Sequence, residues 1–229
     1  MRTLVPEIMD DPGLAPDDHA AALTGLARIN RLSLAARSLY PFVRRVATAV
    51  GGRTRVVDIA TGSADVPIAL AHLARRDGLD LDLVGCDVSG RALEHASARA
   101  RAAAVPFRAV ELDAVRADPP PGDVVLSTLF LHHLHEPDAT TVLERMGRSA
   151  ARAVLVSDLR RGRWGTTLAA VVPRMLTRSR VVHVDALRSA RAAFTTAELD
   201  AMAAAAGLRG ARTRPAFPAR MTLAWERPA

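Results

Sequence analysis

The chain has 229 residues, of which 49% are hydrophobic and only 3% aromatic, and its formal net charge is +7. This length suits one α/β domain with a modest cap, and the single cysteine, Cys86, excludes a disulfide framework. All 31 basic residues are arginines interleaved with 24 acidic residues, so we expect a solvated arginine-rich surface and no nucleic-acid partner. No apolar run reaches the roughly 18 residues of a membrane span, and we expect a cytoplasmic protein.

The N-terminal part is expected to be a lid. Residues 1–20 are rich in Pro and Asp, and helical periodicity follows from residue 21 to residue 50. Pro41 is predicted to divide this stretch into two helices. We therefore expect residues 1–50 to form an N-terminal helical lid over the domain that residues 51–229 make.

Strands and helices then alternate at regular spacing. The predicted strands cover 55–60, 81–87, 107–112, 123–129 and 152–158, and the predicted helices cover 64–77, 89–103 and 137–149. This alternation predicts an α/β fold with a doubly wound, mostly parallel sheet. Such sheets bind ligands outside the carboxyl ends of their strands.

The C-terminal part changes character. Residues 160–194 are expected to be an insertion that caps the substrate, with its second half, 177–194, as a long loop. A capping box, Thr195-x-x-Glu198, then begins a helix over 196–206. The two β-like runs that follow, at 210–216 and 220–226, predict an antiparallel hairpin that completes a seven-stranded sheet.

The most informative motif lies at residues 55–65. A buried strand ends at Asp58, a turn of small residues opens a helix, and a second strand ends at Asp87, 29 residues after Asp58. The turn lets a ligand approach the backbone, and Asp87 is placed to accept hydrogen bonds from both hydroxyls of a ribose. The turn does not match the dinucleotide fingerprint G-x-G-x-x-G, and an acid beside it suits a cationic ligand better than a pyrophosphate.

This turn resembles the first motif of the class I S-adenosylmethionine-dependent methyltransferases, with Ala60 and Ala64 at two of its three usual glycines. The resemblance extends over residues 50–229 and implies that fold, with S-adenosyl-L-methionine as the cofactor. It places Asp58 beside the cationic amino end, Asp87 on the ribose and Asp113 on the adenine amino group. The implied cofactor-binding residues are Asp58, Ala60, Thr61, Gly62, Asp65, Asp87, Val88, Asp113, Ala114, Ser127 and Leu129.

Three histidines follow the strand at 123–129, in a sequence similar to that of small-molecule methyltransferases related to ubiquinone and menaquinone biosynthesis. His132 is the first candidate for a general base, because histidine can accept a proton from a hydroxyl at neutral pH. A histidine that only bonds the strand end is an equal alternative. We expect no metal, because no matching set of Cys and His stands elsewhere in the chain.

His183 and Asp185 are a second candidate pair, since Asp185 at this spacing could orient His183. An exposed polar loop explains both residues equally well. Arg191 could bind a carboxylate or phenolate of the acceptor. The residues expected to contact the substrate are His133, Trp164, Met175 and Arg191.

We therefore expect an S-adenosylmethionine-dependent O-methyltransferase of bacterial secondary metabolism that acts on a hydrophobic, phenolic or polyketide-like molecule. C-methylation of an aromatic or quinone ring is the alternative within enzymes. A non-methylating protein on the same fold, either a cyclase or an interaction partner, is another alternative, and an RNA methyltransferase is less favoured. The oligomeric state is open, with a homodimer as one option.

Overall fold

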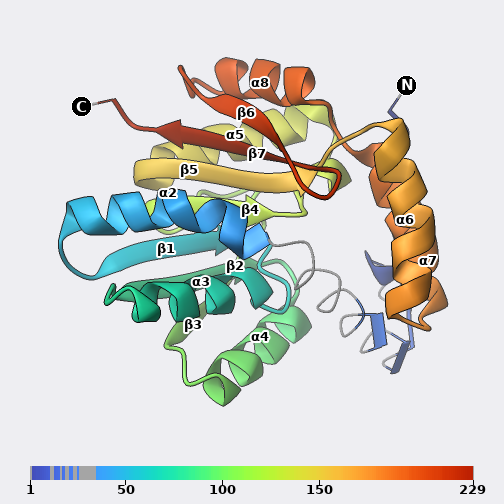
Figure 1. Cartoon of the computed structure of the whole chain (residues 1–229), viewed down its shortest axis with the longest axis horizontal. Helices are drawn as coiled ribbons and strands as arrows, with labels where there is room; N and C mark the ends of the chain where they lie inside the picture. The colour runs from blue at the N-terminus through green and yellow to red at the C-terminus, as the bar shows by residue number, and fades with distance from the viewer. Residues whose placement is uncertain are drawn as a thin grey trace.

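The computed structural model describes residues 2–10, 13–15, 17–18, 21–22, 25 and 35–228. Its centre is a seven-stranded sheet with the order β3-β2-β1-β4-β5-β7-β6 (Figure 1). The strands are β1 (Thr54–Ile59), β2 (Leu81–Asp87), β3 (Phe107–Glu111), β4 (Gly122–Thr128), β5 (Ala150–Leu159), β6 (Arg212–Ala216) and β7 (Arg220–Glu226). The helices are η1 (Ile8–Asp10), α2 (Ala35–Val50), α3 (Asp65–Arg76), α4 (Gly90–Ala102), η2 (Leu131–His133), α5 (Glu136–Ser149), α6 (Arg163–Leu176), α7 (Arg180–Ala192) and α8 (Thr196–Ala205).

The pairing confirms the predicted α/β sheet. Strands β1 to β5 are parallel to one another, whereas β7 runs antiparallel to β5 and β6 antiparallel to β7. The predicted C-terminal hairpin is therefore present, and β7 forms its inner strand. All five parallel strands end at one edge of the sheet, which is where a ligand site is expected.

Helices cover both faces of the sheet. Alternate strand residues such as Val57 and Val56 point into two separate cores. One core packs against α5 and α8, and the other against α2, α3 and α4 (Figure 1). Because both faces are buried, the central strands are continuously apolar, and this is why the sequence pattern identified them correctly.

Helix α2 differs from the prediction of two helices in an N-terminal lid. It continues through Pro41 without dividing, because burial of Leu39, Val43 and Val46 outweighs the one backbone hydrogen bond that proline cannot make. It packs against α3 and along the face of the sheet, so it belongs to the core layer. The rest of the helical prediction, over residues 21–34, lies almost entirely outside the described residues.

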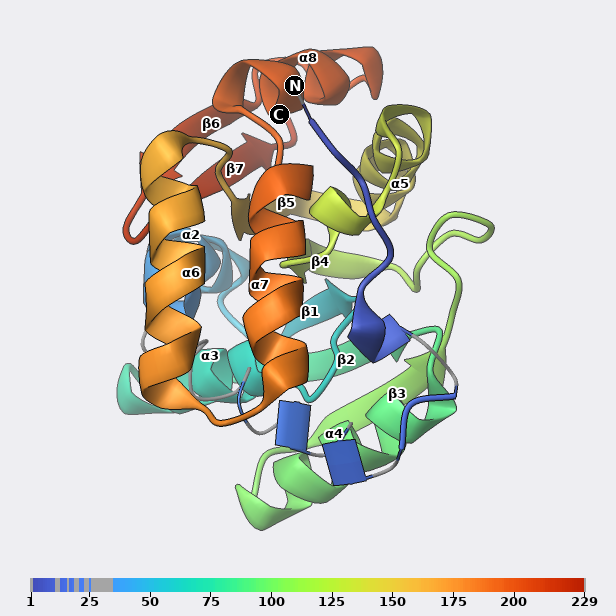
Figure 2. The same ribbon diagram turned by 90° about the vertical axis from the view of Figure 1, so that its right-hand side faces the viewer.

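Most of the stretch 177–194 forms helix α7 (Arg180–Ala192), so the expectation of a long loop was wrong. Ser179 accepts a hydrogen bond from the Val182 N–H and caps α7, which forms an antiparallel pair with α6. Figure 2 shows α6 and α7 side by side at the carboxyl edge of the sheet, with the N-terminal segment passing beside α7. The buried side of α7 includes Asp185 and Ser189, and these polar residues hid its helical periodicity. Among the described residues, no helix has the length and apolar character that crossing a membrane requires.

Candidate active site

In the turn after β1, every second residue from 60 to 64 has a backbone in the left-handed region. Ala60, Gly62 and Ala64 have φ of 53°, 53° and 56°. Only glycine adopts this region without steric cost, so the structure explains why glycines suit these positions and why two alanines are strained there. A Cβ built on Gly62 would meet no atom within 4 Å, so this side of the turn is open.

Asp58 at the end of β1 is buried beneath this turn. Its Oδ2 accepts a hydrogen bond of 2.8 Å from the Thr61 hydroxyl, whereas its Oδ1 is buried without a hydrogen-bond partner among the described residues. Burial raises the pKa of Asp58 to about 8, with a further contribution from the charge of Asp87. A buried carboxyl group with an unpaired oxygen fits a cationic ligand group, which would favour its ionised form.

Asp87 at the end of β2 joins the two halves of the expected nucleoside site. Its Oδ2 accepts from the Gly62 N–H at 2.9 Å, and its Oδ1 accepts from the Ser89 N–H at 3.0 Å. A carboxylate oxygen can accept two hydrogen bonds, and each oxygen of Asp87 accepts one from these backbone groups. One acceptor position on each oxygen therefore remains for a ribose hydroxyl. Val88 beside it is 68% exposed, and its contact with an adenine ring stays a prediction.

Asp65 differs from its neighbours. It forms an ion pair with Arg99 and accepts a hydrogen bond of 2.8 Å from the Ser63 hydroxyl. These partners hold the Asp65 carboxylate at the start of α3, and its contact with the cofactor stays a prediction.

The remaining predicted cofactor residues also lie at the carboxyl edge. Asp113 accepts from the Val115 N–H at 2.9 Å and lies 3.2 Å from the Arg116 Nε, with Ala114 buried beside it. Ser127 and Leu129 continue from the end of β4: the Ser127 hydroxyl donates to the Ile59 carbonyl, and the Leu129 N–H donates to the Ser157 carbonyl.

His132 is buried in η2, and both its backbone and its ring contact the carboxylate of Asp158. Its backbone N–H donates to Asp158 Oδ2 at 3.2 Å, and its Nδ1 lies 2.6 Å from Asp158 Oδ1. Burial by itself would raise the pKa of Asp158, but the contacts with His132 and the Leu159 N–H outweigh burial and lower it. An ionised Asp158 keeps the proton of His132 on Nδ1 and leaves Nε2 as an acceptor.

Asp158 was not predicted as a site residue from the sequence. The signal was present, because Asp158 lies near the end of a predicted strand, as Asp58 and Asp87 do. Nothing in the local sequence indicated that it would meet His132, which is 26 residues earlier and on another element.

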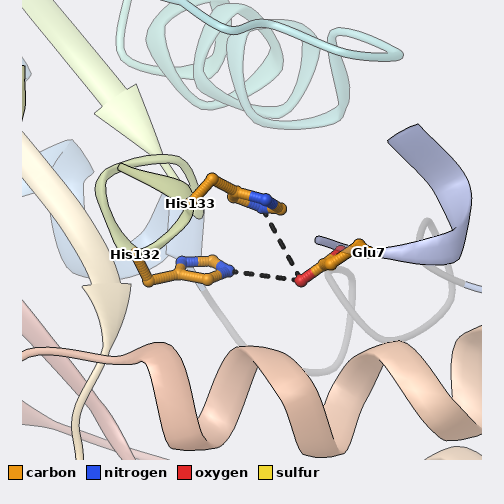
Figure 3. A group of neighbouring side chains, drawn as sticks. All are labelled: Glu7, His132 and His133. Atoms are coloured by element: carbon orange, nitrogen blue, oxygen red, sulfur yellow. Dashed lines mark ion pairs between the residues drawn. The ribbon is translucent and has the colours of Figure 1, made fainter. Parts of the chain in front are cut away.

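Glu7 was missed as well, and it lies against the other side of His132. Its Oε1 is 3.9 Å from His132 Nε2 and 3.8 Å from His133 Nε2 (Figure 3). The Ser189 hydroxyl bonds the same carboxylate. Burial raises the pKa of Glu7, and the two histidines oppose this rise.

The three side chains offer ligand atoms that all lie within 4.8 Å of one another. We expected no metal because the rest of the chain offers no matching Cys and His residues, and Glu7 was not counted as a ligand. It therefore stays a prediction.

A cavity of about 310 Å³ opens at this cluster. Its lining residues are Leu4, Val5, Pro6, Glu7, His132, His133, His135 and Ala192. Half of this lining comes from residues 2–9, which we call the N-terminal strap. The strap therefore closes one side of the cavity, and α7 and η2 close the others.

The strap is fixed by charged side chains. Arg2 donates hydrogen bonds to the carbonyls of His132, Leu134 and Ala192, and its guanidinium lies 3.9 Å from the centre of the Phe194 ring. At the other end of the strap, Asp185 accepts from the N–H groups of Ile8 and Met9 at 2.8 and 3.0 Å.

The second candidate pair does not form. Asp185 faces the strap, whereas the ring of His183 contacts the Thr177 carbonyl at 2.9 Å. Residues two apart on a helix point to different sides, and the predicted geometry assumed a loop.

Three predicted substrate residues also lie away from the cavity. Trp164 and Met175 are 80% and 78% exposed on α6, and Arg191 is exposed on α7. None of them belongs to the lining of the cavity at His132, although His133 does.

Comparison with known proteins agrees with this geometry. Residues 56–152 match the family model described as a methyltransferase domain. A comparison with curated proteins finds no significant match.

Solved structures share the fold. A proposed O-methyltransferase of Nostoc punctiforme PCC 73102 superposes with a TM-score of 0.64 and 19% identity, over 91% of this chain and 61% of that one. Magnesium protoporphyrin IX methyltransferase of Synechocystis PCC 6803 with bound SAH gives 0.60 and 15%, over 96% and 91% of the two chains. An O-methyltransferase family 2 protein of Planctomyces limnophilus DSM 3776, in complex with apigenin, gives 0.60 and 17%, over 94% and 63%.

The chain spans less than two thirds of the length of the Nostoc and Planctomyces proteins, and at these identities the likeness shows the fold. The family model matches the part of the chain that contains most of β1, the turn at Gly62, Asp87 and strands β2 to β4. Residues 56–152 therefore match a methyltransferase domain, and the chain has the fold of solved methyltransferases, one of them with bound SAH.

Proposed function

We propose that the protein transfers a methyl group to a hydroxyl oxygen of an aromatic, phenolic or polyketide-like small molecule. The observation that carries this proposal is the buried His132–Asp158 pair, with Nδ1 and Oδ1 only 2.6 Å apart and Nε2 at a cavity. Asp158 fixes the imidazole as a proton acceptor toward the cavity. A neutral hydroxyl is the acceptor that needs such a base.

The cofactor, when bound, supplies a methyl group that is already activated for displacement. The protein residues then have two tasks, to align the acceptor and to remove its proton. In this proposal Asp58 holds the cationic amino end, Asp87 holds the ribose, and Val88, Asp113 and Ala114 surround the adenine. The backbone around Ser127 and Leu129 borders the position of the methyl group.

Glu7 extends the role of His132. After proton transfer His132 is an imidazolium ion, and it then lies between two carboxyl groups, Asp158 at 2.6 Å and Glu7 at 3.9 Å. An opposite charge at this distance stabilises the protonated ring. His133 contacts Glu7 and also lines the cavity, so we assign it to acceptor binding.

The strap and the α6–α7 hairpin form the cap of the acceptor site in this proposal. The strap supplies half of the cavity lining, and Arg188 of α7 bonds the Pro6 carbonyl of the strap at 2.7 Å. A closed cap excludes water from the reacting centre, which protects the deprotonated acceptor. The cap thus combines residues 2–9 of the expected N-terminal lid with the expected insertion at 160–194.

Two of the compared proteins support the choice of acceptor. The Nostoc protein is described as an O-methyltransferase, and the Planctomyces protein is described with apigenin, which is a phenolic compound. Both share the fold of this chain over more than 90% of its length.

The test is methylation of a panel of phenols and hydroxylated polyketides, with S-adenosylmethionine that carries a ¹³C-labelled methyl group. Mass spectrometry detects the product, and the ¹³C shift of the methyl group distinguishes a methyl ether from a C-methyl group. A methyl ether confirms the proposal. A C-methyl product favours the alternative reaction on an aromatic ring.

Cofactor binding is measured on the same preparation by calorimetry. Binding of S-adenosylmethionine without turnover of any acceptor would favour a non-methylating protein on this fold and would contradict the proposal.

A further inference from the structure

The most exposed large apolar side chains gather around α6. Trp164 and Met175 on α6 are 80% and 78% exposed, and Phe217 in the turn between β6 and β7 is 81% exposed. This turn lies against the start of α6, because the Arg160 N–H donates to the Ala219 carbonyl at 2.9 Å. The aromatic residues at both places are therefore on neighbouring segments.

The exposed residues follow the helix period. Trp164, Val171 and Met175 are spaced by seven and four residues, which places them on one side of α6. On the neighbouring α7, Val184 is 40% exposed. Exposed apolar residues that share a helix side in this way indicate an interaction surface more than scattered surface residues do.

The charge of the chain is concentrated on the same hairpin. Residues 159–192 contain eight arginines and one acidic residue, which gives this segment a net charge of +7. The other 195 residues contain 23 arginines and 23 acidic residues and are neutral in sum. The expectation of an evenly solvated arginine surface therefore fits the rest of the molecule, but not this segment.

Two arginines of the segment are paired with acids: Arg188 lies 3.6 Å from Asp185, and Arg161 is 2.5 Å from Glu198. Asp185 is buried and bonds the strap. Arg174, Arg178 and Arg180 are exposed at the far end of the hairpin, and none of them forms an ion pair with an acid in the part of the chain that the structure describes. We call these three arginines with Trp164, Val171, Met175, Val184 and Phe217 the hairpin face.

We propose that the hairpin face docks on an anionic membrane surface. Tryptophan and phenylalanine side chains bury their rings at the boundary between headgroups and acyl chains, and arginines bind the anionic headgroups. The protein would then be a peripheral membrane protein that binds through this face. The proposal does not depend on which acceptor is methylated.

The composition of the hairpin face favours lipid over two other partners. A second copy of the chain would bring two surfaces of the same sign together, which is unfavourable. Nucleic acid would use the arginines and the aromatic rings, but it would gain little from Val171, Met175 and Val184, which bury well among acyl chains.

The test is flotation of the full chain with two kinds of vesicle, pure phosphatidylcholine and a mixture of phosphatidylcholine with phosphatidylglycerol. We expect at least tenfold stronger partitioning onto the anionic vesicles. The variant Arg174→Gln/Arg178→Gln/Arg180→Gln should lose at least tenfold of this binding, because each arginine contributes to attraction at the surface. Trp164→Ala/Phe217→Ala should weaken binding with the charge unchanged.

The matched control is Arg37→Gln/Arg76→Gln/Arg101→Gln, which removes the same charge from exposed positions on α2, α3 and α4. It should bind as the unchanged protein does. An equal loss in the control would show diffuse attraction and would overturn the proposal, and so would absence of binding to anionic vesicles. Binding to an RNA oligonucleotide in place of vesicles would assign the face to nucleic acid. Melting curves of each variant establish that it is folded.

The fluorescence of Trp164 gives a second measurement. Trp225, the other tryptophan, is buried, so a blue shift on adding anionic vesicles should come from Trp164 and disappear in Trp164→Phe. A shift that persists in Trp164→Phe would contradict insertion of this residue.

Discussion

The cofactor half and the acceptor half of the site are built in opposite ways. In the cofactor half, Asp58, Gly62 and Asp87 come from two consecutive strand–turn–helix units, and the Gly62–Asp87 hydrogen bond joins residues only 25 apart. In the acceptor half, Glu7 meets Ser189, 182 residues away, and His132 meets Asp158 from another strand.

In the proposed function, this difference separates the binding of the cofactor from the binding of the acceptor. The hydrogen bonds of the cofactor half join residues within 58–89 and do not involve the strap or the α6–α7 hairpin. The acceptor half depends on a strap and a hairpin that pack on the sheet edge and can vary without disturbing β1 to β3. Segments over a rigid scaffold are where binding specificity changes most readily.

The strongest test of this separation is His132→Ala. We expect kcat to fall by about 10²–10⁴, because a general base typically contributes this much, while the Kd for S-adenosylmethionine stays unchanged. Steady-state kinetics with an identified phenol and calorimetry with the cofactor measure the two quantities. His135→Ala is the matched control, since His135 lines the cavity but lies outside the cluster with Glu7. A variant that retains its kcat would show that His132 only stabilises the strand end.

Asp87→Ala is the corresponding test of the cofactor half. Loss of two charge-assisted hydrogen bonds to the ribose should weaken S-adenosylmethionine binding by about 1–3 kcal/mol, or about 5- to 150-fold. Asp82→Ala changes a carboxylate near the start of the same strand, where it pairs with Arg55 at the surface, and should leave the Kd unchanged. An unaltered Kd in folded Asp87→Ala would remove Asp87 from the ribose site.

The same contrast explains what could be predicted from sequence. The strands, their order of appearance, the hairpin and the turn at Gly62 follow from hydrophobic runs and local turn chemistry, and the structure confirms them. Asp87 and Gly62 were identified together because parallel strands place their carboxyl ends at one edge.

The acceptor half could not be predicted in this way. Glu7 lies in a stretch without periodicity, and only its contacts with His132 and His133 give it meaning. Asp185 was identified for the wrong reason, since it is a buried partner of the strap and not of His183. Trp164 and Met175 were identified as apolar residues near the site, but their side of α6 is the outer one.

Asp58 provides a smaller, graded test of the cofactor half. Its pKa is raised to about 8 by burial, so below that pH it is protonated and must lose its proton to pair with a cationic amino group. Cofactor affinity should therefore rise with pH between about 6 and 7.5, by up to tenfold per unit, with release of a proton.

Calorimetry in two buffers of different ionisation enthalpy counts the released proton. Asp58→Asn should bind more weakly, with no pH dependence from this position. A wild-type affinity that is flat with pH would exclude an ion pair between Asp58 and the cofactor. The same raised pKa also means that the folded state binds more protons than the unfolded one between about pH 4 and 8, so Asp58 makes the free protein less stable as pH rises through this window.

The smallest effect concerns the strap alone. Asp185→Ala removes the acceptor for the Ile8 and Met9 N–H groups, a loss that resembles removal of a helix cap and is worth about 0.5–2 kcal/mol. Amide hydrogen exchange of residues 2–9 should accelerate by the corresponding few- to thirtyfold, with β1 to β4 unaffected. Asp200→Ala removes a carboxylate acceptor from the Thr213 N–H of β6, outside the strap, and should leave the exchange of the strap unchanged. If the strap and the sheet instead exchange together in Asp185→Ala, the acceptor half is part of the same cooperative unit as the cofactor half, and the separation between them fails.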